Sequence, residues 1–424
     1  MTIGRRIEND HQETCEVETQ VDAGHTEAGT SVRASRAIAV IAIAQLFGTS
    51  LWFSANAAMH DLQTSWHLSA TGIGWLTNSV QLGFIVGTLI SASTGIADRL
   101  PTSRVFAVCG LLGAALNALF ALCSSGVASA IVFRFGVGIA LAGIYPLGMK
   151  LLVTWAPKRA AQTLAWLVAM LTLGTASVHA IRGVLDNVSW HLVVLTSSLL
   201  AVAGALMVLS LGEGPYTRRA APGALISGVG AVFRIREFRA AAFGYFGHMW
   251  ELYAFWTLVP MLVVRAVAGG PMESPRDVAL LSFFIIGIGA VGCVAGGFFS
   301  KWFGSARAAF IALLVSGSLC LIYPLVADKF HGVTPLALLA VWGLAVIADS
   351  PQFSALSVRA CPPEQIGGAL TLQNSIGFFL SACSIFASTS VYHSLGAWIS
   401  LLLLPGPVLG LFAMSPLLAK KPRW

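Results

Sequence analysis

The chain has 424 residues, of which 56% are hydrophobic and only 10% charged, with a formal net charge of +7 and a mean hydropathy of +0.80. This balance excludes a typical water-soluble domain, in which about a quarter of the residues are charged. The length accommodates many membrane-spanning helices, because each needs roughly 20 predominantly apolar residues.

The segment before the first apolar span, residues 1–36, has a different composition. It contains almost no apolar residues and seven acids: Glu8, Asp10, Glu13, Glu16, Glu18, Asp22 and Glu27. Such a segment buries too little surface to fold alone, so we expect a disordered tail. It lacks the basic start, apolar middle and small-residue cleavage site of a signal peptide. We therefore expect the tail to stay in the cytosol, with the first span serving as the insertion signal.

Twelve apolar spans follow this tail, joined mostly by short connections that leave no room for a separate soluble domain. We expect an all-α integral membrane protein with two six-helix bundles, residues 37–212 and 241–418. A cytoplasmic loop, 213–240, would join the bundles, and a cytoplasmic tail, 419–424, would end the chain. In chain order the spans begin near Ala37, Thr71, Val105, Val127, Ala160, Trp190, Ala241, Val278, Ala308, Val333, Ile366 and Ala397.

The basic residues predict the orientation of this bundle. With the N-terminus inside, 19 of the 25 Lys and Arg residues fall on the cytoplasmic side. The exceptions are Arg182, Arg265, Arg276 and Lys329 outside, and Arg134 and Lys150 within spans. This positive-inside pattern predicts a multi-pass protein of the plasma (inner) membrane with both termini cytoplasmic. Because the basic residues border spans and form no separate domain, we expect no nucleic-acid partner.

Two features recur at half the chain length. The charged turn Thr94-Gly-Ile-Ala-Asp98-Arg99-Leu-Pro-Thr-Ser-Arg104 has a degraded copy 203 residues later, from Gly297 to Arg307. Tyr145-Pro146 returns as Ser350-Pro351 at an offset of 205. Such repeats are typical of secondary transporters, whose substrate site lies where the halves meet. Because proline kinks a membrane helix, matched bends at Pro146 and Pro351 favour a gating role over a harmless bend.

These motifs resemble those of the major facilitator superfamily (MFS), and the resemblance covers residues 37–418. The loop motif of that family reads Gly-x-Leu-Ala-Asp-Arg-x-Gly-Arg-Lys. Four positions fit it and two glycine positions are replaced; the fitting residues are Ala97, Asp98, Arg99 and Arg104, and the replacements are Thr94 and Pro101. A second family motif, Arg-x-x-x-Gly, fits Arg134-Phe-Gly-Val-Gly138 in the fourth span.

The resemblance implies a fold and a gate. Spans one, four, seven and ten would line a central cavity. Asp98 would stabilise one access state by interacting with the cytoplasmic end of a helix of the other half, near Ile366, where the helix dipole favours a carboxylate. Arg99 and Arg104 would add ion pairs across the same seam.

Four ionisable residues lie within spans that the resemblance assigns to the pathway: Arg134, His248, Glu251 and Asp349. A charge at this depth is costly, so it usually faces a partner or a cavity. His248 and Glu251 are three residues apart and share one helix face, where they either carry a proton or lock the helix to a neighbour. For Arg134 three roles stay open: receiving an anionic substrate, pairing with Glu251 or Asp349, or modulating proton release.

Uncharged polar and aromatic residues complete the predicted site. Gln373 and Asn374 are substrate-site candidates. Further polar and aromatic residues of the first, second and seventh spans either reach a ligand or pack between helices, and we expect about half to reach it: Trp52, Ser54, Asn56, Asn78, Gln81, Tyr245, Trp250, Tyr253 and Trp256.

Together these patterns predict a secondary active transporter that moves a small organic solute, anionic or aromatic, by alternating access with proton coupling. The alternatives are an uncoupled facilitator and a transporter-like receptor that does not transport. No catalytic triad, metal-ligand cluster or ATP-binding loop stands out, so we expect no enzyme activity and no cofactor, with the proton gradient as energy source. The fifth span lacks the Gly-Pro motif of the family's drug–proton antiporters. The expected partners are the small-molecule substrate and membrane lipid, and the expected state is a monomer.

Overall fold

The computed structural model describes residues 32–157, 160–185, 188–217, 229–362 and 365–419, which are almost entirely helical and contain no strand. Parts of the expected N-terminal tail, inter-bundle loop and C-terminal tail lie outside these residues. The helices of the first half are Val32–Thr49, α2 (Ser54–Ala57), α3 (Met59–Trp66), α4 (Ala70–Thr94), α5 (Ile96–Arg99), α6 (Thr102–Cys123), α7 (Val127–Leu141), α8 (Tyr145–Trp155), α9 (Ala160–Val184) and α10 (Trp190–Leu211).

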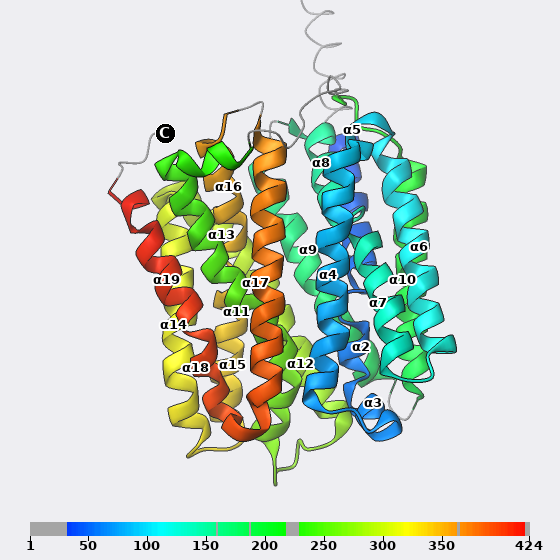
Figure 1. Ribbon diagram of the computed structural model, residues 1–424, viewed down its shortest axis with the longest axis vertical. Coiled ribbons are helices and arrows are strands. Elements are labelled where there is room, and N and C mark those ends of the chain that lie inside the picture. Colours follow the sequence, from blue (N-terminus) through cyan, green and yellow to red (C-terminus); the bar gives the residue numbers. More distant parts are fainter. Residues whose placement is uncertain (1–31, 158–159, 186–187, 218–228, 363–364, 420–424) are drawn as a thin grey trace, which may run out of the picture.

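The second half lies beside the first (Figure 1). Its helices are η2 (Val229–Arg234), α11 (Arg236–Val267), α12 (Pro275–Gly287), α13 (Gly289–Phe303), α14 (Ser305–Ala327), α15 (Val333–Val346), α16 (Ser350–Ala360), α17 (Ile366–Leu395), η4 (Gly396–Ile399), α18 (Ser400–Leu403), α19 (Pro405–Met414) and η5 (Ser415–Leu417).

Eleven helical stretches of the described chain are long and apolar enough to cross a membrane, and the last of them, Ile366–Leu417, has 52 residues, enough to cross twice. The chain reverses at Gly396, whose φ of 54° lies in the left-handed region that glycine adopts without strain. α17 and the pair α18–α19 therefore run in opposite directions (Figure 1). This agrees with the expected twelve spans.

One end of the bundle, which we call the terminal end, carries the start of the first helix and the end of α19 (Figure 1, top). The helix breaks lie at matching places in the two halves. α7 and α8 are separated by residues 142–144, and α15 and α16 by residues 347–349. Pro146 and Pro351 each stand in the first turn of the helix that follows. The predicted bends are therefore present, because proline has no N–H to continue the preceding helix.

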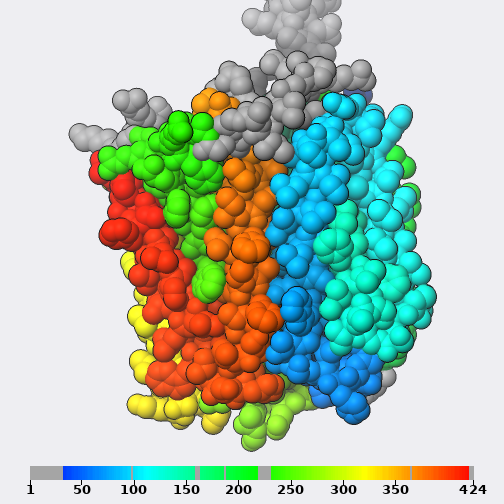
Figure 2. Space-filling model, viewed as in Figure 1, coloured from blue at the N-terminus to red at the C-terminus, as the bar shows by residue number. Residues whose placement is uncertain are grey.

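Two sets of helices join the halves along a seam. α4 packs along α17, where Asn78 Nδ2 donates to the Ala382 carbonyl oxygen at 3.0 Å. α9 packs along α12 and α13, and a Cβ on Gly183 would lie only 2.6 Å from the Leu280 side chain. In the space-filling view α17 and α4 lie side by side over the length of the molecule (Figure 2).

Large apolar side chains cover the outer surface of the bundle. Leu199, Leu409 and Phe412 are 69%, 66% and 82% exposed, on helices of both halves. A water-soluble monomer rarely exposes such continuous apolar surface, whereas lipid solvates it. The buried polar residues lie inside the bundle, where they define the candidate site.

Candidate substrate and proton site

Arg134 of α7 is fully buried, and its hydrogen bonds stay within the first half. Its Nη1 donates to the Leu51 carbonyl oxygen and to Ser54 Oγ, both at 2.9 Å. The same nitrogen lies 3.0 Å from Asn117 Oδ1, and Nη2 donates to the Trp52 carbonyl oxygen. We call this set of residues the arginine clamp.

The clamp satisfies backbone groups at a break in the first transmembrane segment. The chain leaves regular helical geometry between Thr49 and Ser54, so carbonyl oxygens there lose their usual N–H partners. A buried carbonyl without a donor costs about 1–3 kcal/mol, and guanidinium offers several donors in a fixed fork. None of the described bonds of Arg134 reaches an acid, so it pairs with neither Glu251 nor Asp349 in this conformation.

Glu251 of α11 is fully buried in the second half among neutral donors. Trp342 Nε1 donates to Oε1 at 2.7 Å, and Ser316 Oγ donates to Oε2 at 2.8 Å. Cys320 Sγ lies 3.5 Å from Oε1. Among the described residues no basic side chain forms an ion pair with this carboxylate. These bonds join α11 to α14 and α15, as expected if Glu251 locks its helix to the neighbouring helices.

His248 pairs with Asp349. His248 Nδ1 lies 2.7 Å from Asp349 Oδ1, and both side chains are 1% exposed. Asp349 is the last residue of the break before α16, so the pair fixes α11 against that break. His248 and Glu251 therefore share one helix but bond different partners, and the structure does not bring them together as a bonded pair.

The His248–Asp349 pair lies close to the seam. The break that contains Asp349 begins at Ile347, and a Cβ on Gly289 of α13 would meet Ile347 Cγ2 at 2.7 Å. The same Cβ would lie 3.3 Å from the side chain of Thr172, which belongs to α9 of the other half. Thr172 of the first half and the break that contains Asp349 therefore both approach Gly289.

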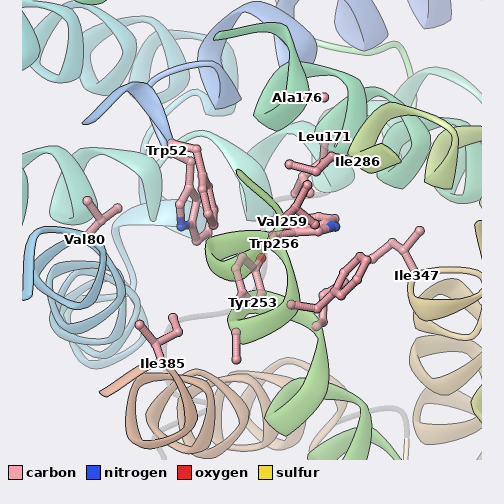
Figure 3. Close-up of a cluster of buried hydrophobic side chains, with 14 of the residues drawn as sticks. Trp52, Val80, Leu171, Ala176, Tyr253, Trp256, Val259, Ile286, Ile347 and Ile385 are labelled. Atoms are coloured by element: carbon pink, nitrogen blue, oxygen red, sulfur yellow. The ribbon is translucent and has the colours of Figure 1, made fainter. Parts of the chain in front are cut away.

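An aromatic cluster fills the centre of the seam, with rings from both halves: Trp52, Phe53, Phe84, Tyr253, Trp256 and Phe378. The Trp52 ring centroid lies 5.6 Å from that of Tyr253 and from that of Phe378, with the ring planes nearly parallel. Phe84 approaches Phe378 at 4.4 Å. Figure 3 shows Trp52, Tyr253 and Trp256 close together between the helices. These ring contacts therefore pack the two halves against each other at the seam.

Buried amide side chains lie on the terminal side of the aromatic cluster. Gln45 precedes Trp52 by two helical turns, and Gln373 of α17 precedes Phe378 by five residues. Gln45 and Gln373 are 0% and 1% exposed. Both amide atoms of Gln45 and Oε1 of Gln373 lack a hydrogen-bond partner among the described residues. Asn374, also predicted for the site, is half-buried.

Three other candidates, Trp250, Asn56 and Ser54, have bonding partners that suit packing, whereas neither amide atom of the buried Gln81 has a partner among the described residues. Trp250 Nε1 donates to the Leu402 carbonyl oxygen at 3.0 Å and so joins α11 to α18. Asn56 Nδ2 donates to Thr77 Oγ1 at 3.0 Å, and Ser54 belongs to the arginine clamp. These residues therefore connect helices.

The charged turn after α4 forms the short helix α5 at the terminal end (Figure 1). Asp98 lies in α5, but its side chain is outside the described parts of the chain. Arg99 and Arg104 are exposed at the same end. The gating role of Asp98 and the ion pairs of the two arginines stay predictions.

Sequence reasoning missed three partners of the buried charges, Asn117, Ser316 and Trp342, and also the buried amide Gln45. One signal was available, because Gln45 precedes His248, and Asn117 precedes Cys320, by the 203 residues of the repeat. The contacts themselves depend on helix packing between segments far apart in the sequence.

The fold and the buried charges at the seam define a multi-pass membrane transporter with two halves. The model of the Major Facilitator Superfamily matches residues 41–385, and the chain belongs to this family. Comparison with curated protein sequences finds no match.

Several solved structures share the fold at low sequence identity. A mutant of the nucleoside transporter NupG superposes with a TM-score of 0.70 at 15% identity, covering 91% of this chain and 100% of that one. A bacterial homolog of the human lysosomal transporter Spinster, inward-facing and unoccupied, gives 0.67 at 14%, covering 91% and 95%. A mutant of the E. coli fucose:proton symporter FucP gives 0.66 at 15%, covering 91% and 98%.

Proposed function

We propose that the protein is a proton-coupled secondary transporter that moves a small organic solute by alternating access, with both termini in the cytosol. The observation that carries this proposal is the buried His248–Asp349 pair, which joins α11 to the break before α16 beside the seam. When both groups are ionised, a pair at this depth costs folding free energy compared with apolar packing, so a functional reason for it is expected.

The chemistry of the pair suits a proton carrier. Imidazole gains and loses a proton near neutral pH, and a carboxylate beside it responds to that change. Glu251 lies one turn along α11 from His248, and its carboxyl group interacts electrostatically with that of Asp349. We propose that the proton resides on this set of three groups, and that its arrival or departure changes how tightly α11 holds the break.

The structure also suggests how access alternates. We propose that the aromatic cluster closes the seam on one side of the pair and separates when the halves rock. The breaks next to Pro146 and Pro351 are the proposed bending points, and Asp98, Arg99 and Arg104 the proposed contacts at the terminal end. Alternating access of this kind is rocking of one half against the other around a fixed site.

Transport into proteoliposomes tests the proposal. The purified protein would be reconstituted and offered a pool of amino acids, sugars, nucleosides, organic acids and aromatic amines, with internal solutes measured by mass spectrometry. We expect at least one solute to accumulate only when a pH gradient is imposed. Equilibration without any effect of the gradient would favour the uncoupled facilitator, and binding without entry would favour the receptor.

A further inference from the structure

We infer that an anionic phospholipid binds on the outer side of the seam between α9 and α13, at the terminal end. Its headgroup lies against Lys301, and its acyl chains lie against exposed aromatic side chains of both halves. The inference goes beyond the proposed function and does not depend on proton coupling. It follows from the geometry of the seam, from the side chains exposed along it and from the charge of the turn between α13 and α14.

α9 and α13 approach each other closely near the terminal end. A Cβ on Gly297 of α13 would lie 3.3 Å from the Ala165 Cβ of α9. Because successive spans alternate in direction, α9 begins at the terminal end and α13 ends there, so the two helices run antiparallel. In an antiparallel pair of right-handed helices, the residue that follows each contact residue turns toward the same side of the seam. Trp166 and Phe298 therefore lie on one side of the seam, and both are exposed.

The exposed face of α13 is apolar along the helix and aromatic near its end. Val291, Phe298 and Trp302 follow one another at spacings of seven and four residues, which places them on one helix face, and Trp302 is 73% exposed. Trp166 adds an indole of α9 on the same side of the seam. Tryptophan is enriched at the level of the lipid headgroups, where its ring meets apolar chains and its N–H meets polar groups. This face is therefore suited to contact both parts of a phospholipid.

Lys301 adds a positive charge to the same face. Its Nζ lies over the Phe298 ring, 4.9 Å from the ring centroid, so the ammonium group is held beside the exposed aromatic side chains. None of the ion pairs within the described ranges of the chain includes Lys301. An ammonium group has three N–H donors, and charge-assisted hydrogen bonds to phosphate are among the stronger ones in proteins.

The neighbouring sequence contains no acid that would neutralise this charge. Residues 278–327, from α12 to the end of α14, include Lys301 and Arg307 but no Asp or Glu. The residue 203 positions before Lys301 is Asp98, so the second copy of the charged turn has a base where the first has an acid. Arg307 is exposed in the first turn of α14 and adds a second positive charge. An anionic headgroup supplies the missing negative charge, and each basic residue near an anionic membrane raises the affinity about fivefold.

A phospholipid in this position contacts both halves of the protein. Trp166 belongs to the first half, and Lys301 and Trp302 belong to the second. The bound lipid therefore stabilises the conformation in which α9 and α13 are packed together at the terminal end, relative to any conformation in which they are apart. Binding affinity measures this contact directly and requires no transport.

Native mass spectrometry of the purified full-length protein in detergent tests the inference. The probes are phosphatidylglycerol and phosphatidylcholine with identical acyl chains, which differ in the net charge of the headgroup. For the first bound lipid we expect phosphatidylglycerol to bind at least about fivefold more tightly, and to raise the melting temperature more. Equal affinity for the two lipids would overturn the inference.

Charge variants locate the headgroup. Lys301→Gln should lower the affinity for phosphatidylglycerol about fivefold, and the double variant with Arg307→Gln should remove the preference over phosphatidylcholine. Arg359→Gln is the matched control, because Arg359 is an exposed base in the last turn of α16, at the same end of the bundle. It should leave the preference unchanged. An equal loss in Arg359→Gln would mean diffuse attraction to all the bases at this end and would contradict a site on α13.

Two tryptophan variants test the contact with the first half. Trp166→Leu should weaken the binding of phosphatidylglycerol while the preference over phosphatidylcholine stays, because it removes a chain contact and no charge. Trp398→Leu is the control, since Trp398 is exposed on η4 at the opposite end, and it should change neither quantity. Unchanged binding in Trp166→Leu would overturn the placement of the lipid across the seam. All the replaced side chains are exposed, so none of the variants leaves a cavity in the core.

Discussion

The two halves of the protein bury charge in opposite ways. In the first half one cation, Arg134, is surrounded by acceptors of its own half at a helix break. In the second half Glu251 accepts hydrogen bonds from Trp342 and Ser316, and His248 pairs with Asp349. Arg134 thus joins helices of the first half, whereas the second half holds the groups to which we assign the proton.

The internal repeat sharpens this contrast. Counting back by the repeat offsets, Gln45 stands where the second half has His248, and Ile144 where it has Asp349. Gln45 lies against Gly148 of α8, as His248 lies near Phe353 of α16. One framework thus holds an amide and an aliphatic residue in one half and an ionisable pair in the other. The difference supports the proposal that the second half carries the proton, while the first half supplies the frame.

The largest expected effect is on the stability of the first half. Arg134→Met should lower the free energy of unfolding by about 3–5 kcal/mol, because it removes the donors to two carbonyl oxygens, Ser54 and Asn117, and leaves the buried Trp52 carbonyl oxygen without its guanidinium donor. Thermal and denaturant unfolding in one detergent would measure it. Arg182→Met is the control: its ion pair with Asp61 is partly exposed, so a loss of about 1 kcal/mol or less is expected. Equal losses would contradict the structural role of the clamp.

A matched pair of tryptophans tests the second half. Trp342→Phe removes an N–H that donates to the Glu251 carboxylate and should cost about 2 kcal/mol, while changing the pH dependence of transport. Trp250→Phe removes an N–H that donates to a neutral carbonyl oxygen and should cost about 1 kcal/mol with the pH dependence retained. Identical pH profiles for the two variants would mean that Glu251 takes no part in coupling.

Sequence predicted the spans well and the site only in part. The predicted starts at Val127, Trp190 and Ile366 coincide with the helices in the structure, because span length and hydropathy are local properties. The pairing of His248 depended on the packing of α11 against a break about 100 residues away, which no local pattern encodes. His248 and Glu251 share one face of α11, which would allow a bond between them. Their side chains instead bond residues of different neighbouring segments.

The smallest expected effect on stability is at the terminal end. Asp98→Asn should slow transport severalfold while changing the free energy of unfolding by no more than about 0.5 kcal/mol, since a gate contact forms in only one access state. Initial transport rates and unfolding curves would be compared with those of Asp328→Asn, which removes an exposed ion pair with Arg265. An unchanged rate would leave Asp98 as a solvated loop charge.

The most direct test of the central claim compares accumulation with exchange in one preparation. Proteoliposomes containing His248→Gln would be loaded with the solute that the unmodified protein accumulates most, and its labelled form would be added outside. If the second half carries the proton, the variant should still exchange labelled for unlabelled solute, because a neutral side chain mimics one fixed protonation state. Its accumulation under a pH gradient should fall to the level of empty liposomes. Full gradient-driven accumulation by this variant would contradict the account.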